Sequence, residues 1–89
     1  MNAHDTIDDA VALALQALAW VLADDARAGR LLALTGLEPD GIRERIGDPT
    51  MLGAVLAFLE SHEPDLISCA ETLGVKPQQL ITAQERLNV

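Results

Sequence analysis

The chain of 89 residues has few aromatic side chains, a single cysteine and little positive charge. Trp20 and Phe58 are its only aromatic residues, and tyrosine is absent. Strands are enriched in aromatic and β-branched residues, whereas the fifteen Leu and fourteen Ala of this chain favour helices. These proportions predict an all-α fold, and the length suits one domain.

The scarcity of cysteine limits both the chemistry and the compartment. Cys69 is the only one, which excludes an internal disulfide and a zinc site built from several thiolates. The first ten residues, MNAHDTIDDA, are acidic where a signal peptide carries positive charge. The longest apolar stretch, residues 10–23, is too short to span a bilayer. We therefore expect a cytoplasmic protein with no membrane partner.

Positive charge is scarce and concentrated. Six basic residues face fourteen acidic ones, for a net charge of −8, which disfavours binding to nucleic acid or to anionic lipid. Four of the five arginines fall within residues 26–47: Arg27, Arg30, Arg43 and Arg45. This basic segment either docks an acidic partner or a phosphate, or pairs within the chain with Asp24, Asp25, Glu38, Asp40 and Glu44, since surface ion pairs are common.

Proline and glycine divide the chain into short helices. Helices are predicted at about 6–23, 25–35, 39–47, 49–61, 64–74 and 77–88, with prolines at four of the starts and glycines at three of the ends. Asp5 or Thr6, Asp24 and Asp48 are predicted N-caps. Residues 1–4 are predicted to form a disordered tail. Residues 5–89 are predicted to form a compact single-domain bundle of five to six short helices with a long apolar first helix.

The first helix is apolar around most of its circumference, which is typical of a central helix or of one that contacts a second chain. A domain of this size has a thin core, so some apolar residues are expected at the surface. We expect such a patch on the first helix, and the side chains predicted to form it are Leu13, Ala17, Trp20 and Val21. Gly29 and Gly53 lie inside predicted helices, either as sites of close helix approach or as tolerated surface glycines.

Residues 70–83, AETLGVKPQQLITA, have the cadence of a helix-turn-helix. A DNA-binding regulator using residues 63–88 is therefore an alternative, with Gln78, Gln79, Thr82 and Gln84 offered to the bases. Lys76 and Arg86 are, however, the only cations after residue 46, against six acids. A Gly74 helix end followed by a Pro77 helix start explains the same residues.

No set of catalytic or metal-binding residues can be assembled from the sequence. His62, Glu63 and Asp65 stand together, but no His-x-x-x-His or Glu-x-x-His spacing occurs, and His62 is predicted to end the fourth helix. Cys69 lies among apolar residues, which predicts a buried and inert thiol. We expect no enzyme activity, no cofactor and no metal.

Several blocks of the sequence resemble a known family. These are ALAWVLAD at residues 17–24, LALTGL at 32–37, Asp48-Pro49, and AVLAFLESHE at 54–63. In this order they resemble domain-of-unknown-function family 3572, small proteins found mainly in alphaproteobacteria. The resemblance implies a small helical cytoplasmic protein without assigned catalytic residues, and it carries an association with neighbouring signalling response regulators.

Together these observations predict a non-enzymatic protein–protein interaction module, an adaptor or regulator connected with signalling. Its partner is predicted to be another protein, or a second copy in a homodimer. The predicted docking residues are Arg27, Arg30, Arg43, Arg45 and Trp20.

Overall fold

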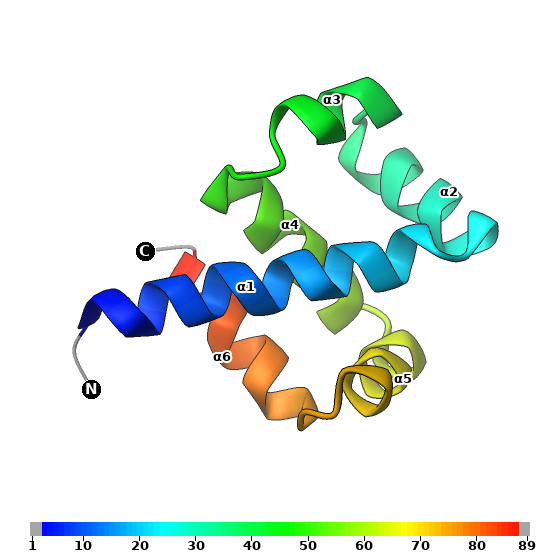
Figure 1. Cartoon of the computed structure of the whole chain (residues 1–89). Coiled ribbons are helices and arrows are strands. Elements are labelled where there is room, and N and C mark those ends of the chain that lie inside the picture. Colours follow the sequence, from blue (N-terminus) through cyan, green and yellow to red (C-terminus); the bar gives the residue numbers. More distant parts are fainter. Residues whose placement is uncertain (1–2, 88–89) are drawn as a thin grey trace.

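The computed structural model describes residues 3–87, which form six α-helices and no strand (Figure 1). The helices are α1 (Ala3–Leu22), α2 (Asp25–Thr35), α3 (Pro39–Glu44), α4 (Pro49–Glu60), α5 (Glu63–Leu73) and α6 (Pro77–Leu87). This confirms the predicted all-α bundle. Within the described residues, no helix combines the length and hydropathy needed to cross a membrane.

The centre of the bundle consists of α1, α4 and α6, which pack more extensively against one another than any other helices do. In Figure 1, α1 crosses the molecule, with α2 and α3 on one side of it and α5 and α6 on the other. The radius of gyration is 12.1 Å, against about 12 Å for a compact chain of this length. The short α3 packs only lightly and lies at the edge.

The core is built of apolar side chains alone, since no polar or charged side chain among residues 8–87 is buried. Leu18 and Val21 of α1 and Leu31 of α2 are fully buried in it. The largest share comes from α4, whose buried residues are Met51, Leu52, Gly53, Val55, Leu56, Phe58 and Leu59. Burial of this apolar surface is the main force that holds the six helices together.

The predicted helix ends are mostly confirmed. The carboxylate of Asp24 accepts a hydrogen bond from the backbone N–H of Arg27 at 3.0 Å, and Asp48 caps α4 in the same manner. Gly74 has a φ of +73°, a left-handed conformation that only glycine adopts without strain. The Val75 N–H bonds to the Ala70 carbonyl at 2.9 Å, as in a Schellman motif.

Three boundaries differ from the prediction. Helix α1 begins at Ala3, earlier than the predicted start at about residue 6, so neither Asp5 nor Thr6 is an N-cap; residues 1–2 of the predicted tail lie outside the described residues. Acidic residues near a helix N-terminus stabilise it, which accounts for the longer helix. Helix α3 ends at Glu44, before Gly47.

The third difference concerns His62, which is the N-cap residue of α5 and not part of the preceding helix. The reason is that α4 stops at Glu60, where the Ser61 hydroxyl donates to the Phe58 carbonyl at 2.7 Å. The two mid-helix glycines also differ from each other. Gly29 is exposed, and a Cβ atom added to it would meet nothing within 4 Å, whereas Gly53 is buried.

Candidate functional site

The four arginines of the basic segment have four different surroundings. Arg27 lies over the ring of Trp20, with its guanidinium carbon 3.6 Å from the ring centroid. Its Nη2 donates to the Trp20 carbonyl at 3.0 Å, which ties the start of α2 to the end of α1. Its Nε is buried and has no hydrogen-bond partner. Arg27 and Trp20, both predicted docking residues, are therefore largely occupied by each other.

Arg30 and Arg43 form ion pairs within the chain. Arg30 donates to the Asp65 carboxylate at 3.0 Å, which joins α2 to α5 across 35 residues of sequence. Arg43 pairs with Asp40 at 3.4 Å on the outside of α3, where both side chains are largely exposed. The Asp40 pair was among those predicted, whereas Asp65 was not among the predicted partners.

Arg45 differs from the other three, because its side chain makes no hydrogen bond, ion pair or ring contact with any residue that the structure describes. It is exposed directly after α3 and lines a hollow between the end of α2, the α3–α4 connection and the outer face of α4. The structure thus divides the basic segment and leaves one of its arginines with an unpaired charge beside a hollow.

This hollow, which we call the α2–α4 groove, has a volume of about 480 Å³. Its lining is mainly apolar: Leu34, Leu37, Met51, Ala54, Ala57 and Phe58, with Thr35, Arg45, Asp48, Thr50 and Ser61 at its edges. Leu34 is 71% exposed, the most exposed of the large hydrophobic residues of the described chain. Ala54 and Ala57 are exposed as well, so solvent reaches the α4 side of the groove.

Most polar groups around the α2–α4 groove are already satisfied. The Thr35 hydroxyl donates to the Leu31 carbonyl at 2.7 Å, and the Ser61 hydroxyl donates to the Phe58 carbonyl. The Asp48 carboxylate caps α4 through the Thr50 N–H at 3.0 Å. An apolar surface whose polar edges are internally bonded loses little when water leaves it. The groove therefore has the chemistry of a protein-binding surface, with Arg45 as its one unpaired charge.

The apolar face predicted for docking on α1 is not exposed. Ala17 and Val21 are 0% exposed, and Leu13 and Trp20 are partly buried against the core. This face lies inside because α1 is central and is covered by α4 and α6. Beyond Ala10, the exposed positions of α1 are instead the small or polar residues Ala12, Gln16 and Ala19, together with Leu22 at its end.

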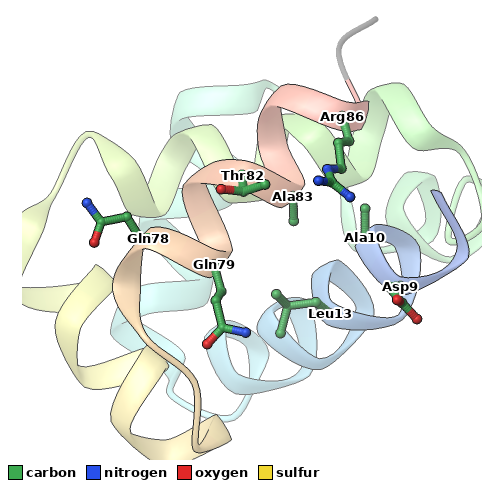
Figure 2. Close-up of a pocket in the computed structure, with 8 residues that line it drawn as sticks. All are labelled: Asp9, Ala10, Leu13, Gln78, Gln79, Thr82, Ala83 and Arg86. Atoms are coloured by element: carbon green, nitrogen blue, oxygen red, sulfur yellow. The ribbon is translucent and has the colours of Figure 1, made fainter. Parts of the chain in front are cut away.

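A second, smaller hollow of about 250 Å³ lies between α1 and α6. Figure 2 shows Ala10 and Leu13 of α1 across from Ala83 of α6, with polar side chains around them. Three residues proposed for base recognition, Gln78, Gln79 and Thr82, line this hollow. The Gln79 side chain accepts from the Lys76 N–H at 2.8 Å, so part of its bonding capacity serves the start of α6.

The same hollow brings charges of both signs together, because Asp9 and Arg86 line it. An acidic residue beside the proposed recognition helix opposes a phosphate backbone. The exposed glutamines that the helix-turn-helix alternative requires are thus present. The cluster of cations that DNA binding needs does not occur beside them in the described residues.

Cys69 is fully buried in α5, as predicted. Burial raises the pKa of its thiol to about 11, while the charge of Arg27 acts in the lowering direction. A thiol in this state is a weak nucleophile at neutral pH. His62 lies 3.9 Å from the Asp65 carboxylate, and the described residues contain no group of three or more His, Cys, Asp or Glu arranged to hold a metal ion.

Apart from Arg45, which was a predicted docking residue, sequence reasoning missed the residues that form the α2–α4 groove. One signal was present, because residues 49–59 contain no charged side chain, although the helix they form has exposed positions. An exposed helix face of an acidic protein normally carries charge, so a charge-free run with Ala54 and Ala57 on the outside is unusual. Leu34 gave no comparable signal, since it reads as one more apolar residue of α2.

One comparison with known proteins gave a match. The model of a family described as "Protein of unknown function (DUF3572)" matches residues 7–89, nearly the whole chain. Searches of the curated proteins and of the solved structures gave no match.

Proposed function

The chain belongs to the DUF3572 family, and we propose that it is a non-enzymatic protein–protein interaction module, a small adaptor or regulator that binds its partner through the α2–α4 groove. One observation carries the proposal: an open, mainly apolar hollow of about 480 Å³ with the exposed side chain of Leu34 beside it. The proposal is supported by the gathering of the exposed side chains of Leu34, Ala54 and Ala57 around one hollow, since grouped apolar residues at a surface are a feature of interaction sites.

The distribution of polar groups supports binding over catalysis. The described part of the groove holds neither a histidine nor a cysteine, and its one carboxylate, Asp48, is engaged as a helix cap. Nucleophilic or acid–base catalysis needs a titratable group placed beside a partner in the pocket. The lining favours a ligand that is itself apolar with a carboxylate near Arg45, as on one face of an amphipathic helix.

The proposal includes a cytoplasmic location and a role connected with signalling. The location is supported by the single thiol, Cys69, which is stable in a reducing compartment without a disulfide partner. The net charge of −8 supports a free protein that avoids anionic surfaces.

The test is affinity capture from a lysate of the native host with three baits. They are the wild type, Ala54→Arg in the α2–α4 groove, and the matched control Ala19→Arg on the exposed side of α1. We expect a protein that wild type and Ala19→Arg capture and Ala54→Arg does not. Equal capture by all three baits, or no specific capture, would contradict an adaptor that binds another protein through the groove.

The second candidate, a DNA-binding regulator using residues 63–88, is favoured by one observation: Gln78, Gln79 and Thr82 of α6 are exposed after a glycine turn. It predicts retention of the protein on duplex DNA at low salt, lost when Lys76 and Arg86 are both changed to Glu. We expect no retention, since Asp9 lies beside these residues and the chain is acidic.

A further inference from the structure

The α2–α4 groove contains both a projection and a recess. Leu34 projects from α2 with 71% of its surface exposed, and Ala54 and Ala57 of α4 present only methyl groups beside it. A two-fold symmetric interface uses the same patch on both copies, so the patch has to complement itself. A projecting leucine beside a mainly apolar hollow, whose floor on α4 includes the small residues Ala54 and Ala57, satisfies this condition.

The charge of this region also suits contact between identical chains. Residues 39–59 contain Arg43 and Arg45 against Asp40, Glu44 and Asp48, a net charge of −1, so the rest of the chain carries −7 of the total −8. Two copies of an acidic protein repel each other, and the repulsion is smallest where each copy is close to neutral. The uncharged outer face of α4 lies in this region.

From these two observations, and resting on the proposed function of the groove, we infer that its occupant is a second copy of this chain. The two copies are related by a two-fold axis close to Ala54 and Ala57. Each Leu34 enters the hollow of the other copy. The small α4 residues let the two copies of this helix approach to about 8 Å, the lower end of the range for packed helices.

A dimer of ordinary size has to extend beyond the lining of the groove itself. A standard interface covers roughly 800 Å² per partner, which is about 15% of the 5319 Å² that the chain exposes. In Figure 1, α3 lies between the end of α2 and the start of α4, so the contact can extend from the groove onto α3. Because apolar contact drives the association and net charge opposes it, added salt strengthens the dimer.

Disulfide trapping tests the axis directly. Cysteine is placed singly at Thr50, Ala54, Ala57 and Ser61 along α4, and at Ala19 on α1 as the control, all exposed positions. The native thiol, Cys69, is 0% exposed and serves as an internal blank. Under mild oxidation we expect Ala54→Cys or Ala57→Cys to cross-link at least about tenfold faster than Ala19→Cys, since residues near a two-fold axis meet their own copies. Equal rates at all five positions would overturn the inference.

Sedimentation equilibrium gives the second test. Wild type is expected at twice its 9.5 kDa mass, with tighter association in high salt, while Leu34→Asp and Ala54→Arg are expected as monomers with unchanged helical circular dichroism. A wild-type monomer at about 1 mM, or variants as dimeric as wild type, would refute the second copy as occupant. In that case, groove-dependent capture of another protein would still support the proposed function. A groove-dependent dimer that captures nothing would support the inference and end the adaptor proposal.

Discussion

The two ends of α2 differ in how completely the fold uses their side chains. At the N-terminal end, Arg27 covers Trp20 and Arg30 pairs with Asp65, so both cations are engaged in joining helices. At the C-terminal end, Leu34 projects into solvent and the nearby groove holds the unpaired Arg45. The side chains at the N-terminal end of α2 thus stabilise the fold, whereas those at its C-terminal end remain available for contact with another molecule.

The largest effect is expected from two leucines of α2 one turn apart. Leu31 is fully buried, so Leu31→Ala removes core packing and is expected to lower the free energy of unfolding by about 2–5 kcal/mol. Leu34→Ala alters a side chain in solvent and is expected to change it by less than about 0.5 kcal/mol, measured under monomeric conditions. Urea titration followed by circular dichroism compares the two variants. Similar losses in both would show that Leu34 belongs to the core as Leu31 does, and that the C-terminal end of α2 is not free for another contact.

The next effect separates two arginines. Arg27→Ala removes the contact with the Trp20 ring and the bond to its carbonyl, with an expected loss of about 1–2 kcal/mol. Arg45→Ala removes no ion pair within the described chain and is expected to leave the free energy of unfolding unchanged. Urea titration measures both, and Trp20 fluorescence should shift in the Arg27 variant only. If the Arg27→Ala protein were as stable as wild type and its fluorescence unshifted, the contact between Arg27 and Trp20 would not hold the N-terminal end of α2 against α1.

The stability of the protein is expected to depend on pH through Cys69 of α5, on which the charge of Arg27 at the N-terminal end of α2 acts. Burial raises the pKa of the Cys69 thiol from 9.0 to about 11, so the unfolded chain loses this proton first as the pH rises. Its contribution to stability is complete below pH 9 and is lost as the pH approaches 11. Melting temperatures of wild type and Cys69→Ala across this range should converge with rising pH. Parallel curves would show that the thiol is not shielded as the structure indicates.

The smallest effect concerns the ion pair between α2 and α5. Arg30 is 46% exposed, so solvent weakens its attraction to Asp65. Arg30→Gln is expected to cost about 0.2–1 kcal/mol, and less in high salt. Double-mutant cycles with Asp65→Asn isolate the pair energy. A coupling energy above that range would show that this ion pair contributes strongly to the packing of α2 against α5. It would sharpen the contrast with the unpaired Arg45.

Much of the fold was predictable because its signals are local. The caps Asp24 and Asp48 and the left-handed Gly36 and Gly74 lie within a few residues of the helix ends that they define. The beginning of α1, at Ala3, was predicted too late at about residue 6, since the acidic start of this helix offers several possible caps. The sequence therefore predicted which segments are helical more reliably than it predicted where each helix begins and ends.

The candidate site was less predictable because exposure depends on neighbours distant in sequence. The α1 face around Ala17 has the composition of an interface, but α6, at the other end of the chain, helps to cover it. Arg30 finds its partner 35 residues away, at Asp65, and this pairing separates it from Arg45. The groove exists because α2 and α4 stand beside each other, and no local pattern states which helices will be neighbours.

The extensive packing of α1 against α6 has a consequence for how the protein is made. A ribosome synthesises roughly 5–20 residues per second, so α1 exists for several seconds before residues 77–87 follow it. Until then, the side of α1 that holds Ala14, Ala17 and Val21 in the finished protein has only part of its cover. During translation, the apolar side of α1 is therefore expected to be shielded either by chaperones or by rapid helix formation. The stable core forms only when the sixth helix has emerged.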